Sequence, residues 1–203
     1  MKQMNLLLLL PLMMMFSCAS FKAERVDDKA SDEKSMEITD NWMGEDTRQS
    51  VKKLITQMQG HKGYKRLMGK FNGTPKVFIA EVQNNTSEAY FPIDDFNDEF
   101  LYEISASGEF TLVDAKARAK ILSEITYQND GMVDPNQAKQ IGKQLGADFM
   151  IFGNVYMKPE KRSGKTLKEY SVNLRMTNVE TAGEVFRIRT RVNKYSDKKS
   201  YGW

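Results

Sequence analysis

The chain has 203 residues, 40% of them hydrophobic, and 30 basic against 27 acidic side chains give a formal net charge of +3. Its only cysteine, Cys18, excludes an internal disulfide framework, and its only histidine, His61, excludes a histidine-rich zinc site. So small a net charge gives no argument for nucleic-acid binding, and we expect no nucleic-acid partner, metal or cofactor.

The first 17 residues are predicted to be a lipoprotein signal peptide. One cation, Lys2, precedes an apolar run from Leu6 to Phe16, which is too short for a transmembrane helix of ~20 residues. The following sequence, Phe16-Ser17-Cys18-Ala19, resembles a bacterial lipobox, in which the cysteine is acylated and becomes the mature N-terminus. Two or more acyl chains on Cys18 would anchor the protein stably to a membrane. The alternative is an ordinary secretory signal with an incidental cysteine.

Residues 18–45 are predicted to be the lipidated cysteine and a disordered acidic tether. From Ala19 to Glu45 the chain has eight acids, four bases and few large apolar residues. Such a composition buries too little apolar surface to fold. As a coil the segment would span only about 30 Å. Residues 46–203 remain for one globular domain, in which a basic start and end flank an acidic middle.

The first half of this domain is predicted to alternate helices and strands. Apolar residues at helical spacing favour a helix over 47–60. A glycine-rich stretch then precedes a strand at 76–83, which begins with KVFIAEV. Pro92 can open a helix that Gly108 ends. The sequence EFTLV, residues 109–113, is a short second strand.

The second half continues the α/β pattern. Helices are predicted from Asp114 to about Thr126 and from Asp134-Pro135 to Gly146. A nearly continuous apolar strand follows at 148–158 and should be central and buried on both faces. Two alternating strands, 167–178 and 184–193, form a hairpin with Gly183 as the left-handed turn residue. The predicted fold is a single α/β domain with a mixed sheet, helices packed on one face and a C-terminal antiparallel hairpin.

No segment indicates a catalytic reaction. SGKT at 163–166 resembles the end of a phosphate-binding loop, but Pro159 replaces the first glycine of that motif and two strands flank the segment. It fits a basic hairpin loop better, so no nucleotide is expected. His61 lies in the sequence GHKG and is interpreted as a solvated loop residue. We therefore predict no catalytic residues and no enzyme activity.

Four arginines form the candidate partner-binding site. The period of two in a strand should place them on one face of the C-terminal hairpin, with Arg175 opposite an arginine of the last strand. Like charges directly across a ladder are destabilising, which favours a function for them. They either dock an acidic partner or only keep a solvated face charged. The four are Arg175, Arg187, Arg189 and Arg191.

Several separate segments resemble one family, the LpoB-type outer-membrane lipoproteins that activate penicillin-binding proteins. KVFIAEVQNNTSE is similar to the first strand and the Asn-x-Thr-Ser turn of that family, SGEFTLVD to its second strand, and NVETAGEV to its final hairpin turn. VDPNQAKQIGKQLGADFMIFGNV is similar to its helix, turn and third strand. The resemblance runs from about Asp46 to Arg191.

The resemblance implies a fold similar to the N-terminal domain of TolB and a function at the cell envelope. The protein would be anchored to the outer membrane, which Ala19 after the cysteine also favours by analogy, and would face the periplasm. Its partner would be a class A penicillin-binding protein, the bifunctional peptidoglycan synthase, which it would activate allosterically. Two alternatives are a structural subunit of a curli-secretion-like lipoprotein pore and another envelope scaffold.

Overall fold

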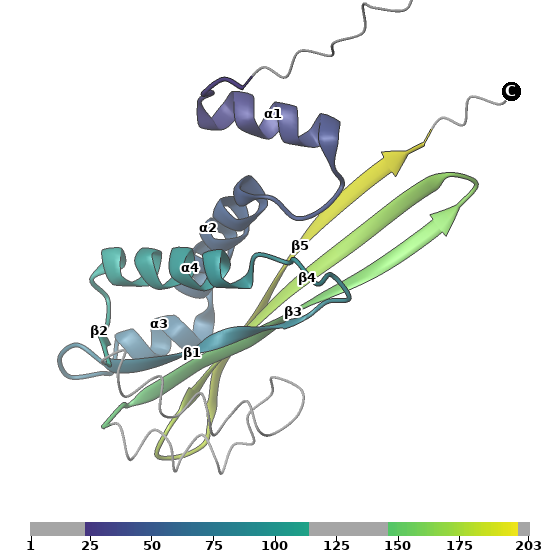
Figure 1. Cartoon of the computed structure of the whole chain (residues 1–203). Helices are drawn as coiled ribbons and strands as arrows, with labels where there is room; N and C mark the ends of the chain where they lie inside the picture. Colours follow the sequence, from purple (N-terminus) through teal and green to yellow (C-terminus); the bar gives the residue numbers. More distant parts are fainter. Residues whose placement is uncertain (1–22, 114–145, 199–203) are drawn as a thin grey trace, which may run out of the picture.

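A computed structural model of the chain describes residues 23–113 and 146–198 (Figure 1). The helices predicted at 114–126 and 134–146 lie outside these residues. The described elements, in chain order, are α1 (Asp28–Ile38), α2 (Gly44–Gly60), α3 (Lys62–Met68), β1 (Lys76–Asn85), α4 (Ile93–Ser107), β2 (Thr111–Leu112), β3 (Phe149–Arg162), β4 (Lys165–Asn178) and β5 (Glu184–Asp197).

The five strands form one mixed sheet in the order β2-β1-β3-β4-β5. β1 runs parallel to β2 and β3, whereas β3, β4 and β5 are successively antiparallel. The predicted mixed sheet and C-terminal hairpin are therefore confirmed. β3 is the central strand, and its first seven residues are all buried, as the continuous apolar run predicted.

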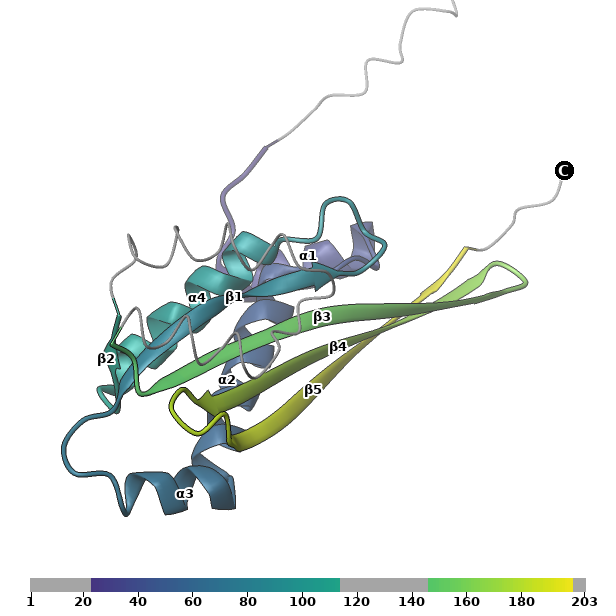
Figure 2. The same cartoon turned by 90° about the horizontal axis from the view of Figure 1, so that it is seen from below.

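The main core lies between the sheet and the helices. α2 and α4 cover one face of the sheet, and α3 packs against the same core beside β5 (Figures 1 and 2). The predicted helical stripes supply this core, with Leu54, Phe96 and Phe100 at 2% exposure or less. α4 ends at Gly108, which has a left-handed φ of 66°, as expected for a glycine C-cap. The opposite face of β1 and β3 has a smaller buried cluster that contains Phe78.

The prediction that residues 18–45 are disordered is wrong for residues 28–38. Residues 28–38 form α1, whose first turn is capped by the side chain of Asp27, which accepts a hydrogen bond from the backbone of Ala30 at 2.8 Å. The core also begins earlier than residue 46, because Trp42 is only 5% exposed. Its ring lies edge-on to Tyr170, with centroids 5.3 Å apart, and its indole nitrogen donates to Thr47 at 2.9 Å.

Charged side chains hold this N-terminal segment on the hairpin. Lys168 of β4 pairs with Asp40 at 2.9 Å and with Glu88 at 2.8 Å. Lys194 stands opposite Lys168 on β5, is only 4% exposed and pairs with Asp46 at 2.7 Å. Two like charges that face each other across the ladder are thus neutralised by three acids. The hydrogen bonds from Ser196 and Lys168 lower the pKa of the Asp40 carboxyl below its usual value.

The stretch expected to be a loop before β1 contains the helix α3, and His61 is its N-cap rather than a solvated loop residue. The Nδ1 atom of His61 accepts a hydrogen bond from the backbone of Gly63 at 3.0 Å, and its ring lies 6.1 Å from that of Phe186. Gly63 is the point of closest approach to the sheet, since a Cβ there would lie 1.9 Å from the carbonyl oxygen of Val185. The lack of a side chain at Gly63 allows α3 to pack closely against β5.

One of the two hairpin turns, between β4 and β5, differs from its prediction. In the β4–β5 turn the residue with positive φ is Ala182, at 57°, and Gly183 instead donates its N–H to the hydroxyl of Thr181 at 3.2 Å. The predicted pairing of even-numbered residues is nevertheless confirmed, as Leu174 faces Ile188. The basic hairpin loop predicted for the SGKT segment is confirmed, as a two-residue β3–β4 turn in which Ser163 and Gly164 have φ values of 50° and 79°.

Candidate functional site

The four predicted arginines lie on the face of the hairpin sheet that points away from α2 and α4. The strand register aligns side chains of β3, β4 and β5 in three rows across this face. The rows are Phe152–Arg175–Arg187, Asn154–Asn173–Arg189 and Tyr156–Ser171–Arg191. Arg175 faces Arg187 directly, so the predicted arginine pair across the ladder is confirmed.

Arg175 differs from the other three because it is half-buried. Its guanidinium lies 4.5 Å above the ring of Phe152, and its side chain keeps only 16% of its exposed area. Burial, and then the nearby charge of Arg187, lower the pKa of Arg175 from its usual value. Glu184 relieves the repulsion, because it lies 3.6 Å from Arg175 and 2.7 Å from Arg187. The Arg175 side chain therefore supports the surface rather than projecting from it.

The remaining arginines project into solvent. Arg187 and Arg191 keep 57% and 55% of their side-chain exposure. Arg189 donates a hydrogen bond to the side-chain oxygen of Asn173, and Arg191 lies 3.8 Å from Glu169. Arg187, Arg189 and Arg191 are called the arginine face below. Arg189 and Arg191 have weaker partners than Arg187, which makes them the more available charges.

A hollow of about 310 Å³ opens beside the arginine face. Its floor is an amide pair, since Asn173 donates to the side-chain oxygen of the buried Asn154 at 3.1 Å. Asn154 donates in turn to the hydroxyl of Tyr156 at 3.3 Å, and 44% of Tyr156 remains exposed. Exposed arginine and tyrosine beside a hollow are the residue types that dominate protein-binding sites. Sequence alternation located the arginines but did not reveal the buried amide.

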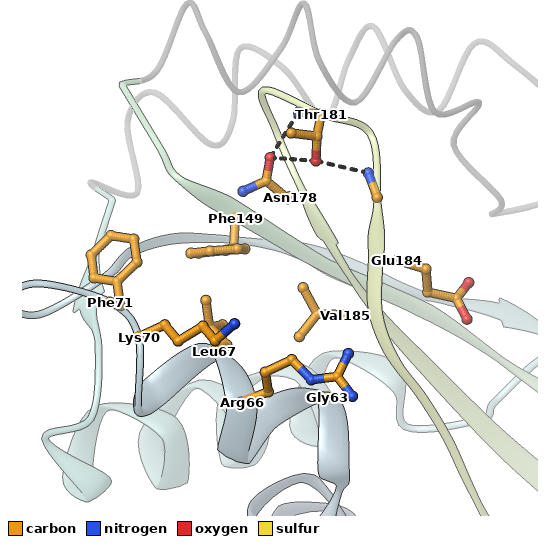
Figure 3. Close-up of a pocket in the computed structure, with 11 residues that line it drawn as sticks. Gly63, Arg66, Leu67, Lys70, Phe71, Phe149, Asn178, Thr181, Glu184 and Val185 are labelled. Carbon is orange, nitrogen blue, oxygen red and sulfur yellow. Dashed lines mark hydrogen bonds between the residues drawn. The ribbon is translucent and has the colours of Figure 1, made fainter.

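A second pocket, of about 440 Å³, lies between α3 and the start of β5 (Figure 3). Leu67, Phe149 and Val185 point into it, and the cations Arg66 and Lys70 extend from the side formed by α3. This pocket was missed at the sequence level because α3 was expected to be a loop. The pocket could accept a small apolar group that has an acidic group beside it. Binding there would have to order the exposed side chains of Arg66 and Lys70, which costs conformational entropy.

The described residues, 23–113 and 146–198, include no cluster of three or more His, Cys, Asp or Glu that could hold a metal. Within the same ranges, no helix has the length and apolarity needed to cross a bilayer. The candidate site combines exposed charge, an aromatic side chain and a hollow.

Fold and surface together define a small α/β domain with exposed arginines on one face of its sheet. The family model described as peptidoglycan-synthase activator LpoB matches residues 46–192. The chain belongs to this family, which is a family of activators of peptidoglycan synthases. The resemblance stated from the sequence motifs is therefore confirmed. A comparison with curated protein sequences gives no match.

Two solved structures have the same fold. The LpoB C-terminal domain from Salmonella enterica aligns with a TM-score of 0.52 and 13% identity, covering 72% of this chain and 98% of that one. The LpoB C-terminal domain from Escherichia coli aligns with a TM-score of 0.51 and 14% identity over the same shares. At such low identity the likeness shows the fold alone, and it confirms the predicted fold class.

Proposed function

We propose that this protein is a lipoprotein that is anchored to the outer membrane through Cys18, faces the periplasm, and activates a class A penicillin-binding protein. Membership in the family of peptidoglycan-synthase activators is the observation that carries this proposal. The short apolar run, the lipobox-like sequence and Ala19 support the anchor and its location. The family indicates a peptidoglycan synthase as the partner. The more specific choice of a bifunctional, class A synthase follows from the resemblance of the sequence motifs.

The arginine face is the proposed contact surface. Arg189 and Arg191 would attract an acidic surface of the synthase, and complementary charge chiefly raises the association rate. Tyr156 and the hollow beside it would then bury an apolar or acidic side chain of the partner. Activation requires the protein to bind the active conformation of the synthase more tightly than the inactive one, because a ligand shifts an equilibrium only by its differential affinity.

The pore-subunit alternative has no support from a particular observation. A membrane pore would need strands of alternating sequence, which the last hairpin offers among the described residues. This hairpin supplies two of the five strands of the domain sheet. Their inner side chains, among them Tyr170, Leu174 and Phe186, are fully or almost fully buried in the main core. Releasing this hairpin would dismantle the domain.

Reversing two charges of the arginine face tests the proposed contact. The double variant Arg189→Glu with Arg191→Glu should melt near the wild-type temperature, because exposed charges contribute only ~0–1 kcal/mol each. Its capture of a class A synthase should weaken roughly tenfold, which corresponds to about 1.4 kcal/mol. Pull-down of the synthase over a range of salt concentrations measures this, and added salt should weaken wild-type capture as screening increases.

The matched control is Lys52→Glu with Lys53→Glu, which changes the net charge by the same amount on the exposed side of α2. This control should capture the synthase like the wild type. Equal capture by the arginine variant and the wild type would place the contact elsewhere. An unfolded arginine variant would show that the row is structural, and the single variant Arg191→Ala would then separate binding from folding.

A further inference from the structure

The hairpin formed by β3 and β4 extends past the body of the domain (Figures 1 and 2). Burial along β3 is complete from Phe149 to Val155 and then gives way to exposure toward Arg162. We define the hairpin tip as residues 158–167 and 195–198, which include the β3–β4 turn and the end of β5 beside it. Its backbone is fixed by strand pairing up to the two-residue turn.

The hairpin tip is basic. Its five exposed cations are Lys158, Lys161, Arg162, Lys165 and Lys198, and its two acids are Glu160 and Asp197. One of these acids, Glu160, is already paired with Lys158 at 2.7 Å. By the alternation of a strand, Lys161 and Arg162 point to opposite faces. Several exposed cations on a protruding turn suit an extended anionic surface.

Two apolar side chains accompany these cations. Leu167 is 39% exposed and Tyr195 is 56% exposed, and they stand opposite each other in the β4–β5 register. Tyrosine beside aliphatic and basic residues is typical of segments that lie in the headgroup layer of a bilayer. The composition of the tip is therefore that of a membrane-surface contact.

The tip lies at the same end of the molecule as the start of the described chain (Figure 1). The segment after α1 is bonded to the strands next to the tip, through Asp40 with Lys168 at 2.9 Å and through the hydrogen bond from Ser196 to Asp40. Cys18 is ten residues from Asp28, which starts α1, so their separation is at most about 35 Å. Any bilayer that holds the acyl chains of Cys18 is thus close to this end of the domain.

We propose that the hairpin tip binds the anionic phospholipid headgroups of the membrane that holds Cys18. The inference rests on the lipid anchor of the proposed function. α1 has four acids and two bases, so the attraction comes from the tip and not from this helix. Each basic residue near an anionic bilayer raises partitioning about fivefold. Tip contact would fix the orientation of the domain, with the β4–β5 turn and the pocket beside α3 pointing away from the bilayer.

Fluorescence quenching in vesicles tests this contact on the full lipidated chain. Acylation occupies the only native thiol, so Ser163→Cys provides one labelling site at the tip and Glu180→Cys one at the opposite end of the sheet. Each variant is labelled and inserted into vesicles that contain nitroxide-labelled lipid. In vesicles with about 30% phosphatidylglycerol, quenching at residue 163 should exceed that at residue 180 by about threefold. The excess should fall in neutral phosphatidylcholine vesicles or at ~0.5 M salt.

Charge reversal at the tip provides the specific control. Lys161→Glu, Arg162→Glu and Lys165→Glu together should remove the excess quenching at residue 163 while the protein still floats with the vesicles. Without the charge reversal, equal quenching at residues 163 and 180 in protein that floats normally would contradict the tip contact. The lipid anchor would be unaffected by that result. A thiol label reacts with Cys18 only if this cysteine is not acylated. Labelling of Cys18, together with protein that does not float with the vesicles, would therefore refute the lipid anchor and with it this inference.

Discussion

Replacing Cys18 with alanine is expected to abolish stable membrane anchoring. The acyl chains would be the stable attachment, and without them the chain keeps the apolar run before residue 18, which is too short to span a bilayer, and any weak, salt-sensitive contact of the hairpin tip. The variant should accumulate as an unprocessed precursor or a soluble protein that no longer partitions into the detergent phase. Fractionation and detergent phase separation measure both quantities.

Ser20→Ala is the control for Cys18→Ala, since it changes a neighbouring small residue and keeps the thiol. This control should be processed and fractionate like the wild type. If Cys18→Ala were also processed normally and stayed in the membrane fraction, the attachment would have another origin and the lipid anchor would be wrong.

The second large effect is expected from Trp42→Ala, which should lower the free energy of unfolding by about 3–5 kcal/mol. The indole of Trp42 is 5% exposed and packs against Phe91, at a centroid distance of 5.1 Å, as well as Tyr170. Its removal leaves a cavity and leaves the buried hydroxyl of Thr47 without the indole donor. Urea unfolding followed by far-ultraviolet circular dichroism measures the change.

Trp42→Phe separates packing from hydrogen bonding, because phenylalanine keeps an aromatic ring but has no N–H donor. It should cost clearly less than Trp42→Ala. A loss below about 1 kcal/mol for Trp42→Ala would show that the segment before α2 is not part of the folded core.

Trp42 also shows which parts of the fold the sequence does not disclose. Its position in an acidic, weakly apolar segment gave no periodic signal, and its burial depends on partners more than 40 residues away, such as Tyr170. The same applies to α1, whose attachment relies on Lys168. Composition reports what a segment can bury by itself, whereas these contacts are supplied by distant strands.

Periodic signals were more informative. Alternation along β4 and β5 predicted the inner and outer side chains and an arginine of the last strand opposite Arg175, which the register identifies as Arg187. Glycine was ambiguous. Gly108 ends α4 as predicted, whereas Gly63, in the GHKG sequence that was interpreted as a loop, allows α3 to approach Val185. A glycine required for close packing looks the same in the sequence as one required for a turn.

The candidate site divides in a similar way. Its exposed charges, Arg187, Arg189 and Arg191, were predictable because they alternate with core residues. The half-burial of Arg175 over Phe152 and the buried amide of Asn154 depend on β3 lying beside β4, a pairing between separate strands. The sequence therefore predicted which face carries charge but not how the hollow beside that charge is built.

The rate of glycan polymerisation by a class A penicillin-binding protein tests the central proposal most directly. Purified wild-type protein, added to the synthase and its lipid-linked disaccharide substrate, should raise the rate several-fold and to saturation. The variant Arg189→Glu with Arg191→Glu should need roughly tenfold more protein for the same rate, in line with a loss of about 1.4 kcal/mol in binding. A polymerisation rate that does not change when a saturating amount of the wild-type protein is added would contradict the proposed function.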